Sequence, residues 1–124
     1  MTPAPAQVTA PPADAAEDAA TAATYHSLGR KLLQEDRFEE AIEQLTEAVK
    51  LDPVLAQAYN ARGYAHFRLK QYAEALADFD RAIKLYPGYA NAYVNRAATR
   101  RASGDKAGAA ADQAMARELT AKAQ

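Results

Sequence analysis

The chain has 124 residues, of which 49% are hydrophobic and 25% charged, a length and composition that fit one soluble globular domain. Its formal net charge of -1 and pI near 6.1 exclude a whole-molecule attraction to nucleic acid or to an anionic membrane, since either needs a clear basic excess. The absence of cysteine excludes disulfides and cysteine-ligated metals, and no apolar run approaches the roughly 18 residues of a membrane helix.

Residues 1–21 are predicted to form a flexible tail rich in alanine and proline. Nothing bulkier than Val8 is available there to enter a core, and residues 1 to about 13 are expected to be disordered. From Asp14 the composition turns to alanine, and Asp14 with Glu17 has the spacing of a capping box, so a helix can begin near residue 14. Such a spacer fits many cytosolic linkers and also an exported protein trimmed of its leader, so the protein is expected to be cytoplasmic by default, and periplasmic or secreted if a leader was removed.

From residue 22 the chain repeats itself with a fixed period. The stretch KLDPVLAQAYNARGYA, which begins at Lys50, and KLYPGYANAYVNRAAT, which begins at Lys84, are identical at seven of sixteen positions. A third copy aligns with these two, although less closely. The aligned columns are Tyr25, Tyr59 and Tyr93; Gly29, Gly63 and Ala97; Ala41, Ala75 and Ala109; Leu45, Phe79 and Gln113; Ala48, Ala82 and Ala116; and the closing Pro53 and Pro87.

The columns predict a hairpin of two helices in each unit. Helices are expected over 24–35, 38–51, 57–70, 72–85, 91–103 and 106–121, with short turns between the members of each pair. The small residues Gly29, Ala41, Gly63 and Ala75 allow close helix contact, and the space around it is expected to be filled by Tyr25, Leu28, Leu32, Leu45, Tyr59 and Phe79. Because one hairpin cannot bury its apolar face alone, the hairpins must stack, and the predicted fold is all-α.

This spacing resembles the tetratricopeptide repeat (TPR), a pair of antiparallel helices in each unit of roughly 34 residues. The resemblance covers residues 22–124, as repeats 22–55, 56–89 and 90–123, and implies a right-handed α-solenoid of three antiparallel helix pairs. The third unit departs from the pattern at Ala97, Gln113 and Ala121. Its second helix is expected to cap the stack, or alternatively to pack on a second copy, and its thin apolar stripe is Ala109, Ala110, Ala116 and Leu119.

Charge divides between the expected inner and outer helices. The first helices of the pairs carry one acid, Glu35, and eight bases: Arg30, Lys31, Arg62, Arg68, Lys70, Arg96, Arg100 and Arg101. The second helices carry five bases and nine acids: Glu39, Glu40, Glu43, Glu47, Glu74, Asp78, Asp80, Asp112 and Glu118. A basic inner layer and an acidic back are therefore predicted.

The resemblance implies that the first helix of each pair lines a concave groove. The family's groove positions carry His26, Ser27, Arg30, Leu33, Gln34, Gln57, Asn60, Tyr64, Phe67, Arg68, Asn91, Val94, Asn95 and Arg101. Asparagine can donate to and accept from an extended backbone, arginine binds carboxylates through paired hydrogen bonds, and aromatic rings offer apolar surface. The predicted peptide-binding residues are His26, Arg30, Asn60, Tyr64, Phe67, Arg68, Asn91, Asn95 and Arg101. Arg62 and Arg96 are instead expected to pack on the neighbouring helix and pair with its acids.

One specialised version of the family binds chaperone C-termini through a carboxylate clamp of lysine, asparagine and arginine. The corresponding positions here carry His26, Arg30, Ala61, Asn91 and Asn95. None of the five keeps its clamp residue, so no high-affinity clamp for chaperone tails is predicted.

The leading hypothesis is a protein-interaction module that holds an extended, acidic segment of a partner protein. The alternative is a scaffold that assembles weakly with itself, concave face to convex face or end to end. No enzyme and no cofactor are expected, because His26 and His66 lack ligand-spaced partners and no nucleophile motif or phosphate-binding loop occurs. His66 falls on a core-facing column. Nucleic acid is not an expected partner, since the inner bases lack a stacking series of aromatics.

Overall fold

The computed structural model describes residues 13–123, which form six α-helices and no strand. The helices are α1 (Ala13–Gln34), α2 (Phe38–Leu51), α3 (Ala56–Arg68), α4 (Tyr72–Leu85), α5 (Ala90–Ala102) and α6 (Lys106–Lys122). Apart from the early start of α1, every helix end falls within two residues of the predicted range. Disorder is expected for residues 1 to about 13. Of these, residues 1–12 lie outside the described part of the chain.

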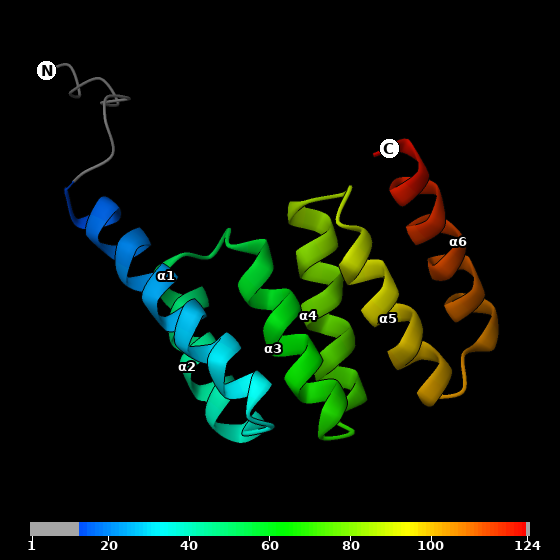
Figure 1. Cartoon of the computed structure of the whole chain (residues 1–124), viewed down its shortest axis with the longest axis horizontal. Helices are drawn as coiled ribbons and strands as arrows, with labels where there is room; N and C mark the ends of the chain where they lie inside the picture. Colours follow the sequence, from blue (N-terminus) through cyan, green and yellow to red (C-terminus); the bar gives the residue numbers. More distant parts are fainter. Residues whose placement is uncertain (1–12, 124) are drawn as a thin grey trace, which may run out of the picture.

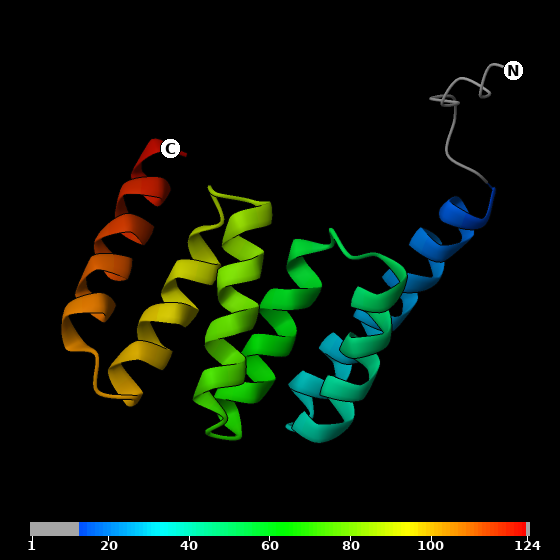
Figure 2. The ribbon, with the colours of Figure 1, turned by 180° about the vertical axis from the view of Figure 1, so that it is seen from behind.

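The helices form two layers of a right-handed α-solenoid. In Figure 1, α1, α3 and α5 lie side by side across the front; Figure 2, seen from behind, shows α2 and α4 nearer the viewer and α6 beside α5 at one end. Each helix contacts the next one along the chain, and within the front layer α1 also contacts α3, and α3 contacts α5. The all-α solenoid of three helix pairs is thus confirmed.

Two glycines allow the helices of the first two pairs to touch. A Cβ at Gly29 would lie 2.5 Å from Leu45 Cγ, and a Cβ at Gly63 would lie 2.7 Å from Phe79 Cε1. Leu45 and Phe79 are fully buried as a result. Leu28, by contrast, does not fill this space as expected: it is 43% exposed, because it lies on the side of α1 that no other hairpin covers.

Arginine–aspartate pairs join the helices within a hairpin and also join neighbouring hairpins. Arg62 Nε and Nη2 donate to Asp78 Oδ2 and Oδ1 at 2.9 and 2.8 Å, and its Nη1 donates to Thr46 Oγ1 of the preceding hairpin at 3.3 Å. Arg96 repeats this arrangement with Asp112 at 2.9 and 2.8 Å and with Asp80 of the preceding hairpin at 2.9 Å. The prediction that these two arginines pair with acids of neighbouring helices is confirmed.

The last helix closes one end of the solenoid, and α5 is the helix it contacts. Ala109 and Ala116 are buried and Leu119 is half-buried, as the predicted stripe requires. Ala110 is exposed, contrary to expectation. The face of α6 that meets α5 contains Asp112 instead, which pairs with Arg96 and Arg100. Gln113, in the column of the buried Leu45 and Phe79, is exposed as well. A polar residue in that column suits a helix that ends a stack.

The three turns within the hairpins are built alike. Asp36, Lys70 and Gly104, which share one column of the repeat, have φ values of 59, 62 and 98°. The backbone N–H of the residue that follows each of them donates to a carbonyl of the preceding helix: Arg37 to Leu32 O at 2.9 Å, Gln71 to His66 O at 2.8 Å and Asp105 to Arg100 O at 2.8 Å. This is the left-handed helix end that glycine adopts most easily, yet two of the three positions lack glycine.

Candidate functional site

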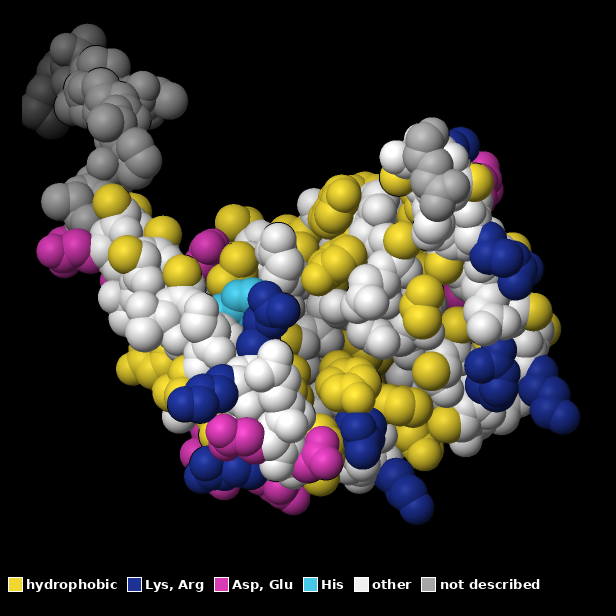
Figure 3. Space-filling view, viewed as in Figure 1, with side chains coloured by type: hydrophobic (Ala, Val, Ile, Leu, Met, Phe, Trp, Pro, Cys, Tyr) yellow, Lys and Arg dark blue, Asp and Glu magenta, His cyan; other side chains and the backbone are white. Residues whose placement is uncertain are grey.

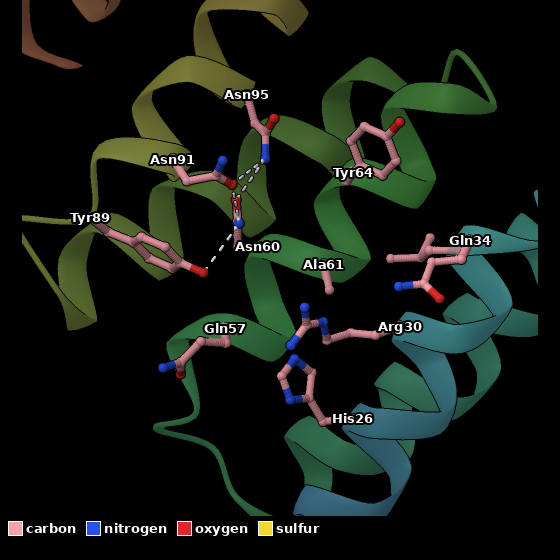
Figure 4. Close-up of a pocket in the computed structure, with 11 residues that line it drawn as sticks. His26, Arg30, Gln34, Gln57, Asn60, Ala61, Tyr64, Tyr89, Asn91 and Asn95 are labelled. Carbon is pink, nitrogen blue, oxygen red and sulfur yellow. Dashed lines mark hydrogen bonds between the residues drawn. The ribbon is translucent and has the colours of Figure 1, made fainter. Parts of the chain in front are cut away.

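The front layer contains a groove with a volume of about 520 Å³. Its walls come from α1, α3, α5 and the loop before α5, and Figure 4 shows their side chains converging. The lining residues are His26, Arg30, Leu33, Gln34, Gln57, Asn60, Ala61, Tyr64, Tyr89, Asn91 and Asn95. Of the nine residues predicted to bind a peptide, the structure brings six together here: His26, Arg30, Asn60, Tyr64, Asn91 and Asn95.

The other three predicted residues lie outside this groove, because local partners hold them. Phe67 packs against Tyr72 with ring centroids 6.1 Å apart. Arg68 donates to Tyr64 Oη at 2.9 Å and lies over the Phe38 ring at 4.8 Å, so it joins the first two hairpins. Arg101 donates to Gln113 Oε1 at 3.0 Å on the last hairpin.

Three asparagines on one side of the groove form what we call the amide cluster: Asn60, Asn91 and Asn95. Asn60 Nδ2 donates to Asn91 Oδ1 at 2.9 Å, and Asn95 Nδ2 donates to Asn60 Oδ1 at 3.0 Å and to Asn91 Oδ1 at 3.2 Å. Asn60 is buried, and it bridges α3 to α5 through these bonds. The cluster therefore holds its amides in fixed orientations before any ligand arrives.

Tyr89 lines the groove although the sequence analysis did not single it out. It precedes α5, and its hydroxyl accepts from Asn60 Nδ2 at 3.3 Å. Burial raises the pKa of Tyr89, so the phenol stays protonated at neutral pH. Its ring also stacks on Tyr86, with centroids 5.3 Å apart. A signal was present, because in the alignment of the repeats Tyr89 stands in the column of Leu55, an apolar residue packed on the core.

The opposite side of the groove, which we call the cation wall, consists of His26 and Arg30 on α1. Arg30 is the one fully cationic side chain among the lining residues, and no described carboxylate forms an ion pair with it. Burial, and secondly the nearby Arg30, lower the pKa of His26 below its usual value of 6.5. His26 is therefore neutral at pH 7, and among the lining residues Arg30 alone supplies positive charge to the groove.

The charge division between inner and outer helices does not become a simple division between two faces. Three of the eight inner bases, Arg62, Arg96 and Arg100, are paired with the outer acids Asp78, Asp80 and Asp112. In Figure 3 the acidic side chains gather mainly at the α1–α2 end and are sparse over α3 and α5. The middle of the face is thus largely uncharged, with Arg30 as the cation in its groove.

Residues 13–123 carry neither a metal site nor a membrane span. Within this range no three His, Cys, Asp or Glu side chains are grouped so that they could hold a metal ion. Nor does any helix there have the length and apolar character needed to cross a membrane. His66, on its predicted column, is half-buried between Gln71 Oε1 at 2.7 Å and Asp78 Oδ2 at 3.9 Å.

The comparisons with known proteins agree on one family. The family model described as tetratricopeptide repeat matches residues 26–90. No curated protein sequence matches the chain. Among solved structures, the first TPR of Spaghetti (RPAP3) bound to the HSP90 peptide SRMEEVD is 31% identical with a TM-score of 0.80, over 82% of this chain and 80% of that one.

Two further structures carry the same fold. The TPR2B domain of yeast Sti1 in its pHsp70 complex is 27% identical with a TM-score of 0.81, over 83% of this chain and 82% of that one. The TPR domain of Arabidopsis OM64 is 24% identical with a TM-score of 0.82, over 85% of this chain and 87% of that one. The repeated columns, the stacked hairpins and the matching family model together show that the chain belongs to the tetratricopeptide repeat family.

Proposed function

We propose that the protein is an interaction module that binds an extended, acidic segment of a partner protein in the groove between α1, α3 and α5. The observation that carries the proposal is Arg30, a guanidinium in a concave site with no described acid of its own chain paired to it. Arginine pairs with a carboxylate through two parallel hydrogen bonds. A partner carboxylate supplies the missing counter-charge.

The solved relatives support a peptide as the ligand. Spaghetti (RPAP3) TPR structures hold the HSP90 peptide SRMEEVD, and the Sti1 structure is a complex with pHsp70. The five positions that the sequence analysis assigned to the family's carboxylate clamp all line the groove here. They supply one arginine, one neutral histidine, one alanine and two asparagines. The groove therefore lies where the family's clamp lies, but it carries fewer positive charges than a clamp of lysine, asparagine and arginine.

The proposed function is tested by selection from a displayed library of random twelve-residue peptides on the full chain. Peptides with acidic residues should be enriched. Arg30→Glu should lose them, because the reversed charge repels a carboxylate in a partly enclosed site. The matched control is Lys31→Glu, which makes the same charge change at the next residue on an exposed side chain outside the groove.

Three results bear on the proposal. Loss of capture in Arg30→Glu with retention in Lys31→Glu supports it. Equal capture by both variants places binding elsewhere and overturns the groove assignment. Recovery of no peptide at all by the unchanged chain overturns the function itself. The comparison of the two variants requires that circular dichroism shows both folded as the unchanged chain is.

Self-assembly through a basic front and an acidic back is less favoured by the structure. That hypothesis depends on charge complementarity between the two layers, and the pairs formed by Arg62, Arg96 and Arg100 neutralise part of that charge within one molecule.

A further inference from the structure

The two sides of the groove offer different hydrogen-bonding chemistry. The cation wall presents the guanidinium of Arg30, which carries donors and no acceptor. Figure 4 shows Arg30 extending from α1 toward α3, with its guanidinium beside the ring of His26 and across the groove from the amide cluster. A carboxylate, which only accepts, is the natural partner for that side.

The amide cluster has one donor group and one acceptor left over. Asn91 Oδ1 already accepts two bonds, from Asn60 and Asn95, which leaves its Nδ2 group without a described partner. Asn95 uses Nδ2 to donate to Asn60 and Asn91, which leaves its Oδ1. In Figure 4 both unused atoms are directed away from Asn60.

A carboxylate fits this second side poorly. It could accept from Asn91 Nδ2, but it would meet the negative end of the Asn95 amide at Oδ1 without a proton to offer. One residue of an extended peptide presents its own N–H donor and C=O acceptor on the same side, so its backbone can satisfy both asparagines at once. The amide cluster therefore matches backbone, and the cation wall matches an acid.

We propose that the groove divides its ligand between these two sides, with a single carboxylate on Arg30 and the backbone C=O and N–H of one ligand residue on Asn91 and Asn95. The proposal rests on the function proposed above and specifies its ligand. One carboxylate of the ligand binds Arg30, and further acids contribute little to affinity because the lining residues include no second full cation. The carboxylate can belong to an Asp or Glu side chain or to a chain end, and the test separates these sources.

The probe is the tightest peptide recovered by the selection above, labelled and measured by fluorescence anisotropy on the full chain. Each acid is changed to Gln or Asn in turn, and the C-terminus is made free or amidated. One of these changes should lower affinity about tenfold or more, the cost of losing a charge-assisted bond pair, and the others less than about twofold. Against Arg30→Gln, that critical change should have no further effect.

The backbone half of the proposal is tested at Asn91. Asn91→Asp keeps the Oδ1 acceptor used by Asn60 and Asn95 and exchanges only the unused donor group. The matched control is Gln57→Glu, the same amide-to-acid change in the groove lining but outside the amide cluster. Asn91→Asp should weaken binding about tenfold more than Gln57→Glu, because both add one negative charge and remove one amide group but only the first removes a donor of the amide cluster. N-methylation of one peptide N–H should cost a similar factor.

The outcomes distinguish a failure of this inference from a failure of the proposed function. Two results would show that the groove binds peptides but does not divide its ligand between the two sides. In the first, binding depends on Arg30 but affinity falls by a similar factor when any acid of the peptide is replaced. In the second, Asn91→Asp and Gln57→Glu weaken binding equally. If a side-chain change is critical, the source is internal; if amidation is critical, it is a C-terminus. A selection that recovers no peptide overturns both proposals.

Discussion

Arg62 and Asp78 form a two-pronged ion pair between α3 and α4, and the same geometry recurs one repeat later between Arg96 and Asp112. The side chains of Arg62 and Asp78 are 21% and 7% exposed, so screening by solvent is limited. The first hairpin has Leu28 and Gln44 in the same two columns. The first hairpin therefore pairs its helices without this ion pair.

This comparison predicts how the second hairpin responds to substitution. Asp78→Ala should lower the free energy of unfolding by about 3 kcal/mol, because it leaves a half-buried guanidinium without its counter-charge. The double change Arg62→Leu with Asp78→Gln, which copies the first hairpin, should cost only about 1 kcal/mol. Urea unfolding of the two variants measures the difference. Equal losses would mean that the pair acts through packing alone.

The glycine column predicts opposite requirements in neighbouring units. Gly63→Ala should destabilise the fold by about 1–3 kcal/mol, because the new Cβ would press on the fully buried Phe79 ring. Ala97→Gly, the reverse change in the same column, should also destabilise, by about 1 kcal/mol through lost helix propensity.

Thermal unfolding followed by circular dichroism tests this pair of substitutions. The two variants should both melt below the unchanged chain. If Ala97→Gly instead raised the melting temperature, the third hairpin would be overpacked at this column, and helix propensity would not decide the effect.

The helices, their pairing and the core columns could be predicted from the sequence, because three copies of one pattern fix which positions recur. The paired arginines Arg62 and Arg96 could be predicted for the same reason. Arg68 and Arg101 could not be placed, since family position says where a side chain starts but not that Phe38, Tyr64 or Gln113 will hold its end. Tyr89 was missed because it precedes the helix on which the groove positions were counted.

The left-handed turns predict a stabilising substitution. Lys70 has a φ of 62°, a conformation that strains a side chain with a Cβ. Lys70→Gly should raise the free energy of unfolding by about 1 kcal/mol, whereas Lys70→Ala should have almost no effect because it keeps the strain. Gly104→Ala should lower stability by about 1 kcal/mol for the same backbone reason, since nothing lies near enough to clash with the added carbon. Chemical denaturation of the three variants decides whether backbone or side chain is responsible.

His26 predicts a pH dependence of ligand binding. In the free protein its pKa lies below 6.5, because burial and then Arg30 disfavour the charged ring. A carboxylate placed on Arg30 offsets that positive charge and raises the pKa of His26, so the complex binds more protons than the free protein. Peptide affinity should therefore rise as pH falls from about 7 through the pKa of the complex, and level off below the pKa of the free protein.

Affinity is therefore expected to be higher at pH 5.5 than at pH 7.5. The other groups that face His26 across the groove are Gln57 and Ala61 of α3 and the protonated Tyr89, none of which titrates in this range. His26→Gln should flatten the profile, whereas His66→Gln, which changes the one other histidine of the chain outside the groove, should leave it intact. A profile that persists in His26→Gln would assign the proton to the ligand, and the link between the ring and the Arg30 site would then be absent.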